Sequence, residues 1–341
     1  NLAVKNGQVF LIGGSATEPS SVVRIDLSSR ETEILHRSRE ITVGREYISI
    51  PNALEFPTEN ERTAFAFFYP PRNPEYEAPP GEKPPLLVVS HGGPTSASPS
   101  TLRYEVQYWT SRGIGVVDVN YGGSTGYGRE YRKRLNDQWG IVDVQDCVNA
   151  TRYLASHGQA DGERLGIRGG SAGGYTTLCA LAFTNTFKAG ASYFGVSDLE
   201  LLAKDTHKFE SRYLDKLVGP YPERRDIYRA RSPIYHVDGI SSALILFQGL
   251  QDKVVPPDQS EKIFEAVKAK GLPVAYIAYE WEQHGFRRAE NIKRSYEAEL
   301  YFYSKIFQFN LADQIEPVNI ENLEAEGTKP ILPPMEMAET F

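Results

Sequence analysis

Residues 169–173 read Gly-Gly-Ser-Ala-Gly, a Gly-x-Ser-x-Gly pattern centred on Ser171. The run 164–168 before it is typical of a short strand, and the run 175–183 after it predicts a helix. A serine at such a turn has a strained backbone and an exposed hydroxyl, and side chains two residues to either side would collide, so both positions favour Gly. We predict that Ser171 is a catalytic nucleophile. The alternative is a glycine turn that lets a helix pack on a strand.

Two polar residues further along the chain could activate that hydroxyl. A serine needs a base to remove its proton, and the base needs a third group to hold it. Asp252 follows the apolar run 243–248, and His284 follows the run 274–280. Both runs are typical of parallel strands, whose carboxyl ends meet at one edge of a sheet. We therefore predict that Asp252 orients His284 and that His284 takes the proton of Ser171. Asp198 also follows an apolar run and is the alternative acid.

A third segment could stabilise negative charge on a substrate oxygen. Residues 85–90 predict a strand, and residues 91–94 read His-Gly-Gly-Pro. A glycine pair lets the backbone approach a substrate, so we predict that the N–H groups of Gly93 and Ala172 form an oxyanion hole. His91 itself is expected to be structural. The glycine-rich run 120–128 lacks the Lys of a phosphate-binding loop and is expected to be a structural turn near the site.

The elements that would position these residues alternate along the chain. Strands are predicted at 63–69, 86–90 and 113–120, and helices near 103–112, 142–156, 257–270 and 289–307. Alternation of this kind implies an α/β fold with a doubly wound, mostly parallel sheet. The proline-rich run 75–85 is expected to be a surface loop.

Taken together, these residues resemble the catalytic domain of the prolyl oligopeptidase family, and in particular its acylaminoacyl peptidase and dipeptidyl aminopeptidase branch. The matching pieces span roughly residues 45 to 307; they are 46–49 leading into 54–57, 90–94, 120–128, 139–143 with Asp146, 170–174, 248–252 and 282–286. The resemblance implies an α/β-hydrolase fold and serine hydrolysis of short peptides, with Ser171, Asp252 and His284 as the catalytic triad.

Two features depart from that family. Its acylaminoacyl peptidases tend to have Arg, and its dipeptidyl peptidases Asn, two residues after the triad acid, whereas this chain has Val254. The difference points to a less polar pocket or to an aminopeptidase-like relative. Family members also carry a β-propeller of several hundred residues before the hydrolase domain, but only residues 1–44 precede it here.

The resemblance divides the chain into three segments. We expect residues 1–44 to be a β-hairpin remnant of a propeller, with strands at 9–14 and 21–26, residues 45–310 to be the peptidase domain, and residues 311–341 to be an acidic, proline-containing tail that is extended or disordered. The chain begins with Asn1 rather than Met, so we expect a fragment of a longer protein whose missing propeller is its natural partner.

Composition excludes several classes of function. The net charge is −7, and residues 311–341 hold seven acids and one Lys, which leaves the rest nearly neutral. A nearly neutral domain lacks the basic face that nucleic-acid binding needs. No apolar stretch approaches 18 residues, so no membrane span is expected. The two cysteines, Cys147 and Cys179, form neither a disulfide framework nor a metal pattern and fit a reducing, cytoplasmic location. No cofactor or metal is expected.

A substrate pocket is expected around the nucleophile. Small-molecule pockets are largely apolar with a few polar anchors. The candidates are Tyr175, Phe194, Val196, Phe209, Tyr213, Val254 and Val255. The alternative for each of them is an ordinary place in the core.

The sequence thus predicts a serine peptidase that cleaves short peptides or aminoacyl substrates through an acyl-enzyme. Fold does not fix the substrate, so a carboxylesterase on the same fold is one alternative. A catalytically silent domain used for binding or assembly is another. The sequence leaves the oligomeric state open.

Overall fold

A computed structural model describes residues 2–205 and 212–323 of the chain. It contains two β-sheets. The smaller sheet is antiparallel, with its strands in chain order. These strands are β1 (Leu2–Lys5), β2 (Gln8–Ser15), β3 (Glu18–Asp26) and β4 (Thr32–Arg37).

The larger sheet has eight strands in the order β12-β11-β10-β9-β7-β8-β6-β5. The pairs β5–β6 and β6–β8 are antiparallel, and all other pairs are parallel. The inner strands β10 and β11 are buried along their whole length because helices cover both faces of the sheet. The strands are β5 (Asn52–Thr58), β6 (Arg62–Tyr69), β7 (Leu86–Ser90), β8 (Gly115–Asn120), β9 (Leu165–Gly170), β10 (Ala189–Tyr193), β11 (Ala243–Gly249) and β12 (Val274–Tyr279).

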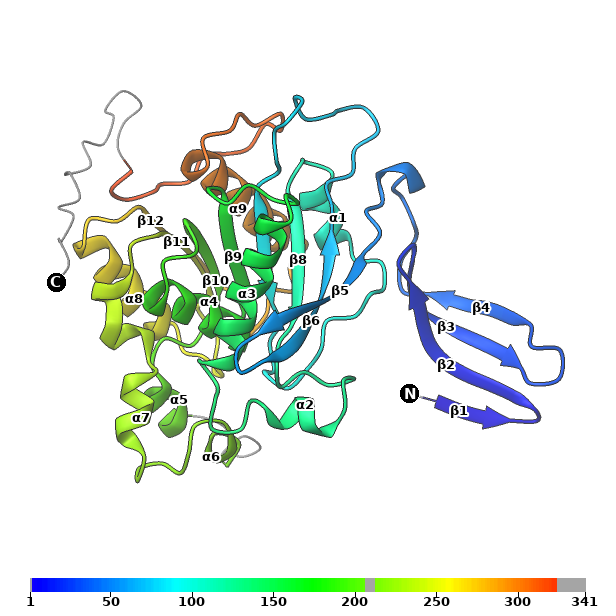
Figure 1. The fold of residues 1–341 in the computed structure, drawn as a ribbon, viewed down its shortest axis with the longest axis horizontal. Helices are drawn as coiled ribbons and strands as arrows, with labels where there is room; N and C mark the ends of the chain where they lie inside the picture. Colours follow the sequence, from blue (N-terminus) through cyan, green and yellow to red (C-terminus); the bar gives the residue numbers. More distant parts are fainter. Residues whose placement is uncertain (1, 206–211, 324–341) are drawn as a thin grey trace.

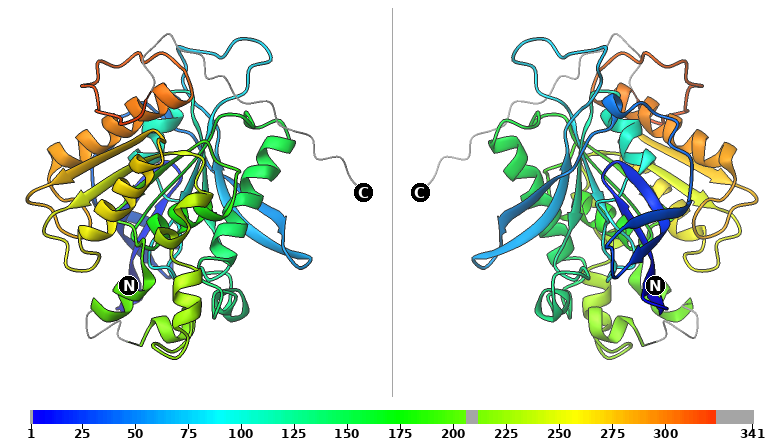
Figure 2. Two further views of the ribbon diagram at one scale, coloured as in Figure 1. Left: turned by 90° about the vertical axis from the view of Figure 1, so that its left-hand side faces the viewer. Right: turned by 90° about the vertical axis from the view of Figure 1, so that its right-hand side faces the viewer.

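Helices pack on both faces of this sheet and form two cores (Figure 1, Figure 2). Residues of α3, α4 and α8 form one core with one face, and residues of α1 and α9 form the other core with the opposite face. The helices are α1 (Tyr104–Thr110), α2 (Arg129–Lys133), α3 (Val142–Ser156), α4 (Ala172–Phe183), α5 (Leu199–Asp205), α6 (Leu214–Leu217), α7 (Arg225–Ala230), α8 (Asp258–Ala269) and α9 (Ala289–Ile306). This arrangement confirms the predicted α/β-hydrolase fold with a doubly wound, mostly parallel sheet.

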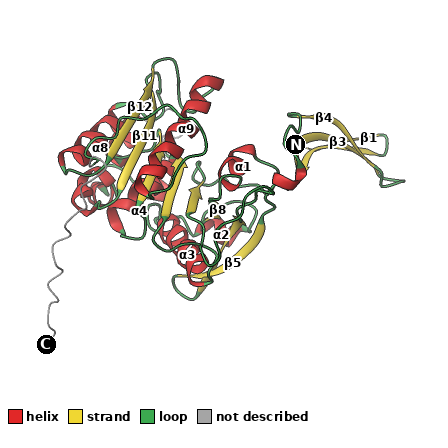
Figure 3. Ribbon diagram, turned by 90° about the horizontal axis from the view of Figure 1, so that it is seen from above, coloured by secondary structure: helices red, strands yellow, loops and turns green. Residues whose placement is uncertain are grey.

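The smaller sheet lies at one end of the molecule, beside the larger domain (Figure 3). A hydrogen bond from the N–H of Leu102 to the carbonyl of Ser15, at 2.7 Å, connects the two, and the segment after β4 is held to α1 by a bond from the N–H of Thr42 to the hydroxyl of Tyr104, at 3.0 Å. We expected a two-stranded hairpin here, but the structure adds β1 and β4, which are exposed along their whole length. Their sequences, Leu-Ala-Val-Lys and Thr-Glu-Ile-Leu-His-Arg, do not alternate between apolar and polar residues, which is the pattern by which a strand is predicted.

The segment after α9 also differs from expectation. Ile315 and Val318 pack against one of the cores, and Ile320 is only 9% exposed. Glu321 pairs with Val274 at the edge of β12. The packed part of the chain therefore extends past residue 310, at least as far as Glu321.

The structure also describes the two cysteines and the helices that could be considered for a membrane span. Both Cys147 and Cys179 are buried free thiols. Among the residues that the structure describes, no helix combines the length and the apolar character that crossing a bilayer requires.

Candidate active site

Ser171 lies at the sharp turn between β9 and α4. Its backbone has φ 55° and ψ −118°, a conformation that L-residues adopt only under strain. Its N–H donates to the carbonyl of Tyr193 at 2.9 Å. A Cβ on Gly169 would lie 2.4 Å from the carbonyl of Gly173, and a Cβ on Gly173 would lie 2.0 Å from the carbonyl oxygen of Ser90. Both glycines of the pattern are therefore required by close backbone contacts around the serine.

Asp252 and His284 reach Ser171 from the ends of β11 and β12. The Nε2 of His284 lies 2.8 Å from Ser171 Oγ, and its Nδ1 lies 2.8 Å from Asp252 Oδ2. The Asp252 side chain is fully buried, and its Oδ1 accepts the N–H groups of Val254 and Val255 at 2.8 and 2.9 Å. The carboxylate can accept the Nδ1 proton, which leaves the Nε2 lone pair directed at the serine hydroxyl.

Asp198, the alternative acid, has a different place. Its Oδ1 accepts the N–H of Glu200 at 2.8 Å at the start of α5, and its Oδ2 accepts the hydroxyl of Tyr235 at 3.1 Å. Both oxygens of the Asp198 carboxylate therefore have other partners, and Asp252 is the carboxylate that contacts His284.

The loop after β7 passes close to the nucleophile. A Cβ on Gly92 would lie 3.8 Å from the Cβ of Ser171, and Gly93 has φ 121°, a conformation that favours glycine. Ala172 is the first residue of α4. Within the described residues, no hydrogen bond occupies the N–H of Gly93 or of Ala172. Both predicted oxyanion donors are thus available to a ligand.

His91 has structural contacts. Its ring stacks on Tyr121 with centroids 4.3 Å apart, and its Nε2 lies 2.7 Å from the hydroxyl of Ser124. Burial lowers the pKa of His91, against the opposing effect of its bond to Gly92. Ser124 belongs to the glycine-rich run 120–128, so this run supports the loop that carries Gly93, as expected.

Three of the predicted pocket residues lie in the core instead. Tyr175, Val196 and Val255 are exposed by 0%, 2% and 1%. The hydroxyl of Tyr175 donates to the carbonyl of Arg231 at 2.9 Å, and its ring packs on Trp139. These side chains present no surface to a substrate, and the prediction that they line the pocket is wrong.

The other four pocket candidates differ in where they lie relative to Ser171 and His284. Phe194 is half-buried, and its ring meets that of His284 edge-on at 4.9 Å. The Tyr213 hydroxyl lies 2.7 Å from Thr95 Oγ1 and 3.3 Å from the carbonyl oxygen of Gly93, on the oxyanion loop. Val254 is half-buried next to Asp252. Phe209 lies outside the described residues.

Sequence reasoning missed an aromatic neighbour of the site. Phe286 is half-buried, with its ring 5.4 Å from that of Phe194 and 4.9 Å from that of Tyr279. Phe286 follows His284 by two residues, which could have indicated that it lies near the site, but only His284 was predicted to have a function there.

A buried ion pair lies close to Ser171 and was also missed. Arg168 on β9 makes two hydrogen bonds to Glu299 on α9, at 2.9 and 3.0 Å. The hydroxyl of Tyr193 donates to the same carboxylate at 2.5 Å, while the Tyr193 carbonyl accepts the N–H of Ser171. The pair therefore connects α9 to the strand end that holds the serine. An arginine inside the otherwise apolar β9 was the signal in the sequence.

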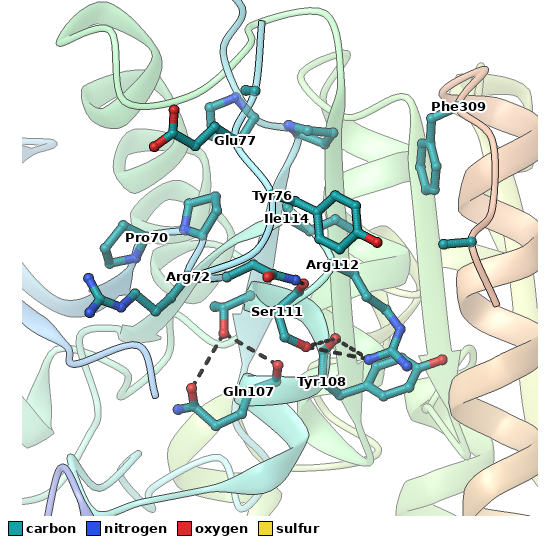
Figure 4. A pocket seen from close by; sticks show the side chains of 18 of the residues that line it. Pro70, Arg72, Tyr76, Glu77, Gln107, Tyr108, Ser111, Arg112, Ile114 and Phe309 are labelled. Carbon is teal, nitrogen blue, oxygen red and sulfur yellow. Dashed lines mark hydrogen bonds between the residues drawn. The ribbon is translucent and has the colours of Figure 1, made fainter. Parts of the chain in front are cut away.

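A large hollow elsewhere in the molecule is separate from this site. It has a volume of about 1380 Å³ and lies between the loop after β6, helix α1 and the segment after α9. Figure 4 shows Tyr76 and Phe309 among the side chains that line it, with Arg112 beside Tyr108. It opens where β7 and β8 begin, whereas Ser171 and His284 lie where parallel strands end. Among the described residues, no three His, Cys, Asp or Glu side chains are grouped to hold a metal ion.

Known proteins match both the sequence and the structure. The sequence pattern of the prolyl oligopeptidase family matches residues 100–310. A puromycin-hydrolyzing peptidase of Mycobacterium tuberculosis is 48% identical with a TM-score of 0.91, over 94% of this chain and 49% of that one. Dipeptidyl aminopeptidase BIII of Pseudoxanthomonas mexicana is 28% identical over 86% of this chain and 44% of that protein. An acylaminoacyl peptidase of Pyrococcus horikoshii is 25% identical with a TM-score of 0.77, over 91% of this chain and 50% of that one.

These proportions show that the chain spans about half the length of the relatives it matches. The family pattern covers more than half of the chain and includes β9, α4 and the strand ends that carry Ser171, Asp252 and His284. The chain belongs to the prolyl oligopeptidase family.

Proposed function

We propose that this chain is the catalytic part of a serine peptidase that hydrolyses short peptides or aminoacyl amides. The observation that carries the proposal is the continuous contact from Asp252 through His284 to Ser171, with both heavy-atom distances at 2.8 Å. These distances are within the range over which a general base takes a proton. The family membership supports the same reading.

Acylation would begin at the serine hydroxyl. Ser171 Oγ bonds to the carbonyl carbon of the substrate while its proton passes to His284 Nε2. The carbonyl oxygen becomes an oxyanion, which the N–H groups of Gly93 and Ala172 stabilise. Asp252 stabilises the imidazolium. The carbon–nitrogen bond then breaks, the Nε2 proton passes to the leaving amine, and the acyl group stays on Ser171.

Deacylation would repeat these steps with water. His284 takes a proton from the water as its oxygen attacks the ester carbon, and the proton then returns to Ser171 Oγ as the acid leaves.

We propose that the substrates are aminoacyl amides. Two of the similar structures, at 48% and 41% identity, are described as a puromycin-hydrolyzing peptidase and a puromycin hydrolase. Puromycin contains an amide between an amino acid and an amino sugar. The half-buried ring of Phe194 lies beside His284, the ring of Phe286 packs against Phe194, and the apolar side chain of Val254 is half-buried next to Asp252. We propose that this surface accepts an apolar or aromatic side chain next to the cleaved bond.

We also propose that the small N-terminal sheet is one blade of a β-propeller that the longer protein would complete. Propeller blades are four-stranded antiparallel sheets, which is the form of β1 to β4. Apolar side chains on this sheet are exposed, including Leu2, Ile12 and Ile34. Adjacent blades would cover them. The buried free thiols support a cytoplasmic location.

A substrate panel tests the proposal. Turnover would be measured for puromycin, for free aminoacyl, dipeptidyl and N-acetyl-aminoacyl nitroanilides, and for an aryl acetate, with Ser171→Ala as the control. We expect cleavage of puromycin and the aminoacyl anilides, lost in the variant. Cleavage of the ester alone would favour a carboxylesterase. Failure of a fluorophosphonate to label Ser171 would favour a silent binding domain.

A further inference from the structure

The side chain of Glu282 binds the far end of the loop that carries His284. The residue is only 2% exposed. Its Oε2 accepts the N–H of Arg287, and its Oε1 accepts the N–H of Arg288 and the side-chain amide of Asn291, each at 2.9 Å. These bonds close residues 282–288 into a loop with His284 inside it.

The carboxylate is charged at neutral pH. Burial raises the pKa of Glu282, but the bonds from Asn291, Arg288 and Arg287 outweigh burial and hold the pKa below its ordinary value. Arg288 is the residue just before α9, and its side chain provides no cap for that helix. A negative charge is favourable at this end because the helix dipole is positive there. Glu282 thus joins the histidine loop to α9, which the Arg168–Glu299 pair fixes to the sheet.

The backbone of Glu282 also contacts the loop that carries Asp252. Its carbonyl accepts the N–H of Gln251, the neighbour of Asp252, at 2.9 Å. The two loops are so close that a Cβ on Gly249 would lie 2.6 Å from the Glu282 carbonyl oxygen. A movement of Glu282 would therefore change the position of His284 relative to Asp252.

We propose that Glu282 is a positioning residue for His284. Its carboxylate fixes the histidine loop to the start of α9, and its carbonyl fixes the same loop to that of Asp252, so that both ring nitrogens keep their 2.8 Å contacts. The expected effect on turnover rests on the proposed function, whereas the expected effect on the imidazole does not.

The variants differ in how many of these bonds they remove. Glu282→Ala removes all three bonds to the side chain. Glu282→Gln keeps the shape, but its NH₂ group replaces one accepting oxygen and would face a backbone N–H. Asn291→Ala removes one bond and leaves the charge in place. Asp198→Asn is a matched control, since Asp198 is also a buried carboxylate that accepts backbone amides, at the start of α5.

Turnover and histidine geometry would be measured together in the full chain. Steady-state kinetics on an aryl acetate would give kcat and KM, and the rate of labelling by a fluorophosphonate would report on Ser171. In protein with nitrogen-15-labelled histidine, the proton on His284 Nδ1 would report directly on the bond to Asp252. Thermal unfolding of each variant would be recorded at the same pH.

We expect kcat and the labelling rate to fall by about tenfold in Glu282→Gln and about 100-fold in Glu282→Ala, with KM nearly unchanged. Asn291→Ala should have a smaller effect of the same kind, and Asp198→Asn should change none of these readouts. The Nδ1 proton signal should shift or broaden in both Glu282 variants. If Glu282→Ala does not fold, Glu282→Gln and Asn291→Ala carry the same test.

Two outcomes would separate the positioning role from the proposed function. A Glu282 variant that unfolds at lower temperature but keeps kcat, labelling rate and the Nδ1 signal of the native protein would overturn the positioning role. If the native protein shows neither turnover nor labelling, yet the Nδ1 signal is lost in the Glu282 variants, the proposed function fails and the positioning role stands.

Discussion

At the scale of single residues, the geometry of Asp252 determines which proton the imidazole carries. Its Oδ2 lies 2.8 Å from His284 Nδ1, and its Oδ1 is held by two backbone amides. An acceptor-only group at this position requires Nδ1 to be the donor, so Nε2 is left as the acceptor for the Ser171 proton.

Asp252→Asn should therefore abolish most activity without disturbing the fold. An asparagine NH₂ group can donate to Nδ1, which would place the imidazole proton on Nε2 and prevent it from accepting the serine proton. We expect kcat on an aryl acetate to fall by about 10⁴-fold, as such a change does in serine hydrolases generally. Circular dichroism would confirm folding. Activity within tenfold of the native protein would contradict the assignment of the acid.

At the scale of elements, α3 and α4 are joined by one fully buried carboxylate. Asp143, near the start of α3, accepts the N–H of Gly140 at 2.7 Å and the hydroxyl of Thr176 on α4 at 2.5 Å. Burial raises the pKa of Asp143 to about 6, despite these bonds. The native state therefore holds this proton more tightly than the unfolded chain, whose carboxyl has a pKa of about 3.9.

This difference predicts a pH dependence of stability. The stabilisation from the retained proton is complete below about pH 4 and is lost as the pH rises through about 6. Two pKa units correspond to roughly 3 kcal/mol. Asp143→Asn cannot ionise, and its amide can donate to Thr176 Oγ1, whose proton can bond the carbonyl of Ala172. Urea unfolding at several pH values should show a smaller fall for this variant between pH 4 and 6; parallel curves would contradict the prediction.

The contact between α9 and the sheet gives a second prediction at this scale. The Glu299 side chain is fully buried, so Glu299→Gln would leave the Arg168 charge without its partner. We expect the free energy of unfolding to fall by about 3–5 kcal/mol in urea. The combined Arg168→Met, Glu299→Leu and Tyr193→Phe variant removes both charges and the Tyr193 hydroxyl, and should recover most of that loss. An equal or greater loss in the triple variant would show that the pair is net stabilising.

The elements and the convergence of Ser171, Asp252 and His284 were predictable from the sequence because each depends on local pattern. The apolar runs that became β11 and β12 end just before Asp252 and His284, and parallel strands bring such ends together. Side-chain direction is not local. Tyr175 follows the nucleophile by one helical turn, but the packing of α4 on Trp139 directs it into the core. The role of Glu282 depends on contacts with residues 287–291 and with Gln251, and no sequence pattern indicates that the two loops touch.

At the scale of the whole molecule, the N-terminal sheet contacts the end of the loop that carries Gly93. The loop that begins at His91 and carries Gly93 continues to Leu102, whose N–H donates to Ser15 of β2. Tyr104, which follows, donates through its hydroxyl to the carbonyl of Glu40 at 3.1 Å. The part of the larger domain that contacts the N-terminal segment thus follows directly, along the chain, from the loop that forms one wall of the candidate site.

The two buried cysteines allow the opening of this molecule to be timed. Cys147 and Cys179 are both 0% exposed, and burial raises the pKa of each thiol well above its ordinary value. A thiol reagent reacts with thiolate, so modification must await exposure of α3 or of α4, the helix that begins just after Ser171. We expect both thiols to react at least roughly 10³-fold more slowly in native protein than in urea. Rapid modification of Cys179 alone, with ester turnover intact, would instead mean that α4 detaches from the sheet many times for each global unfolding event.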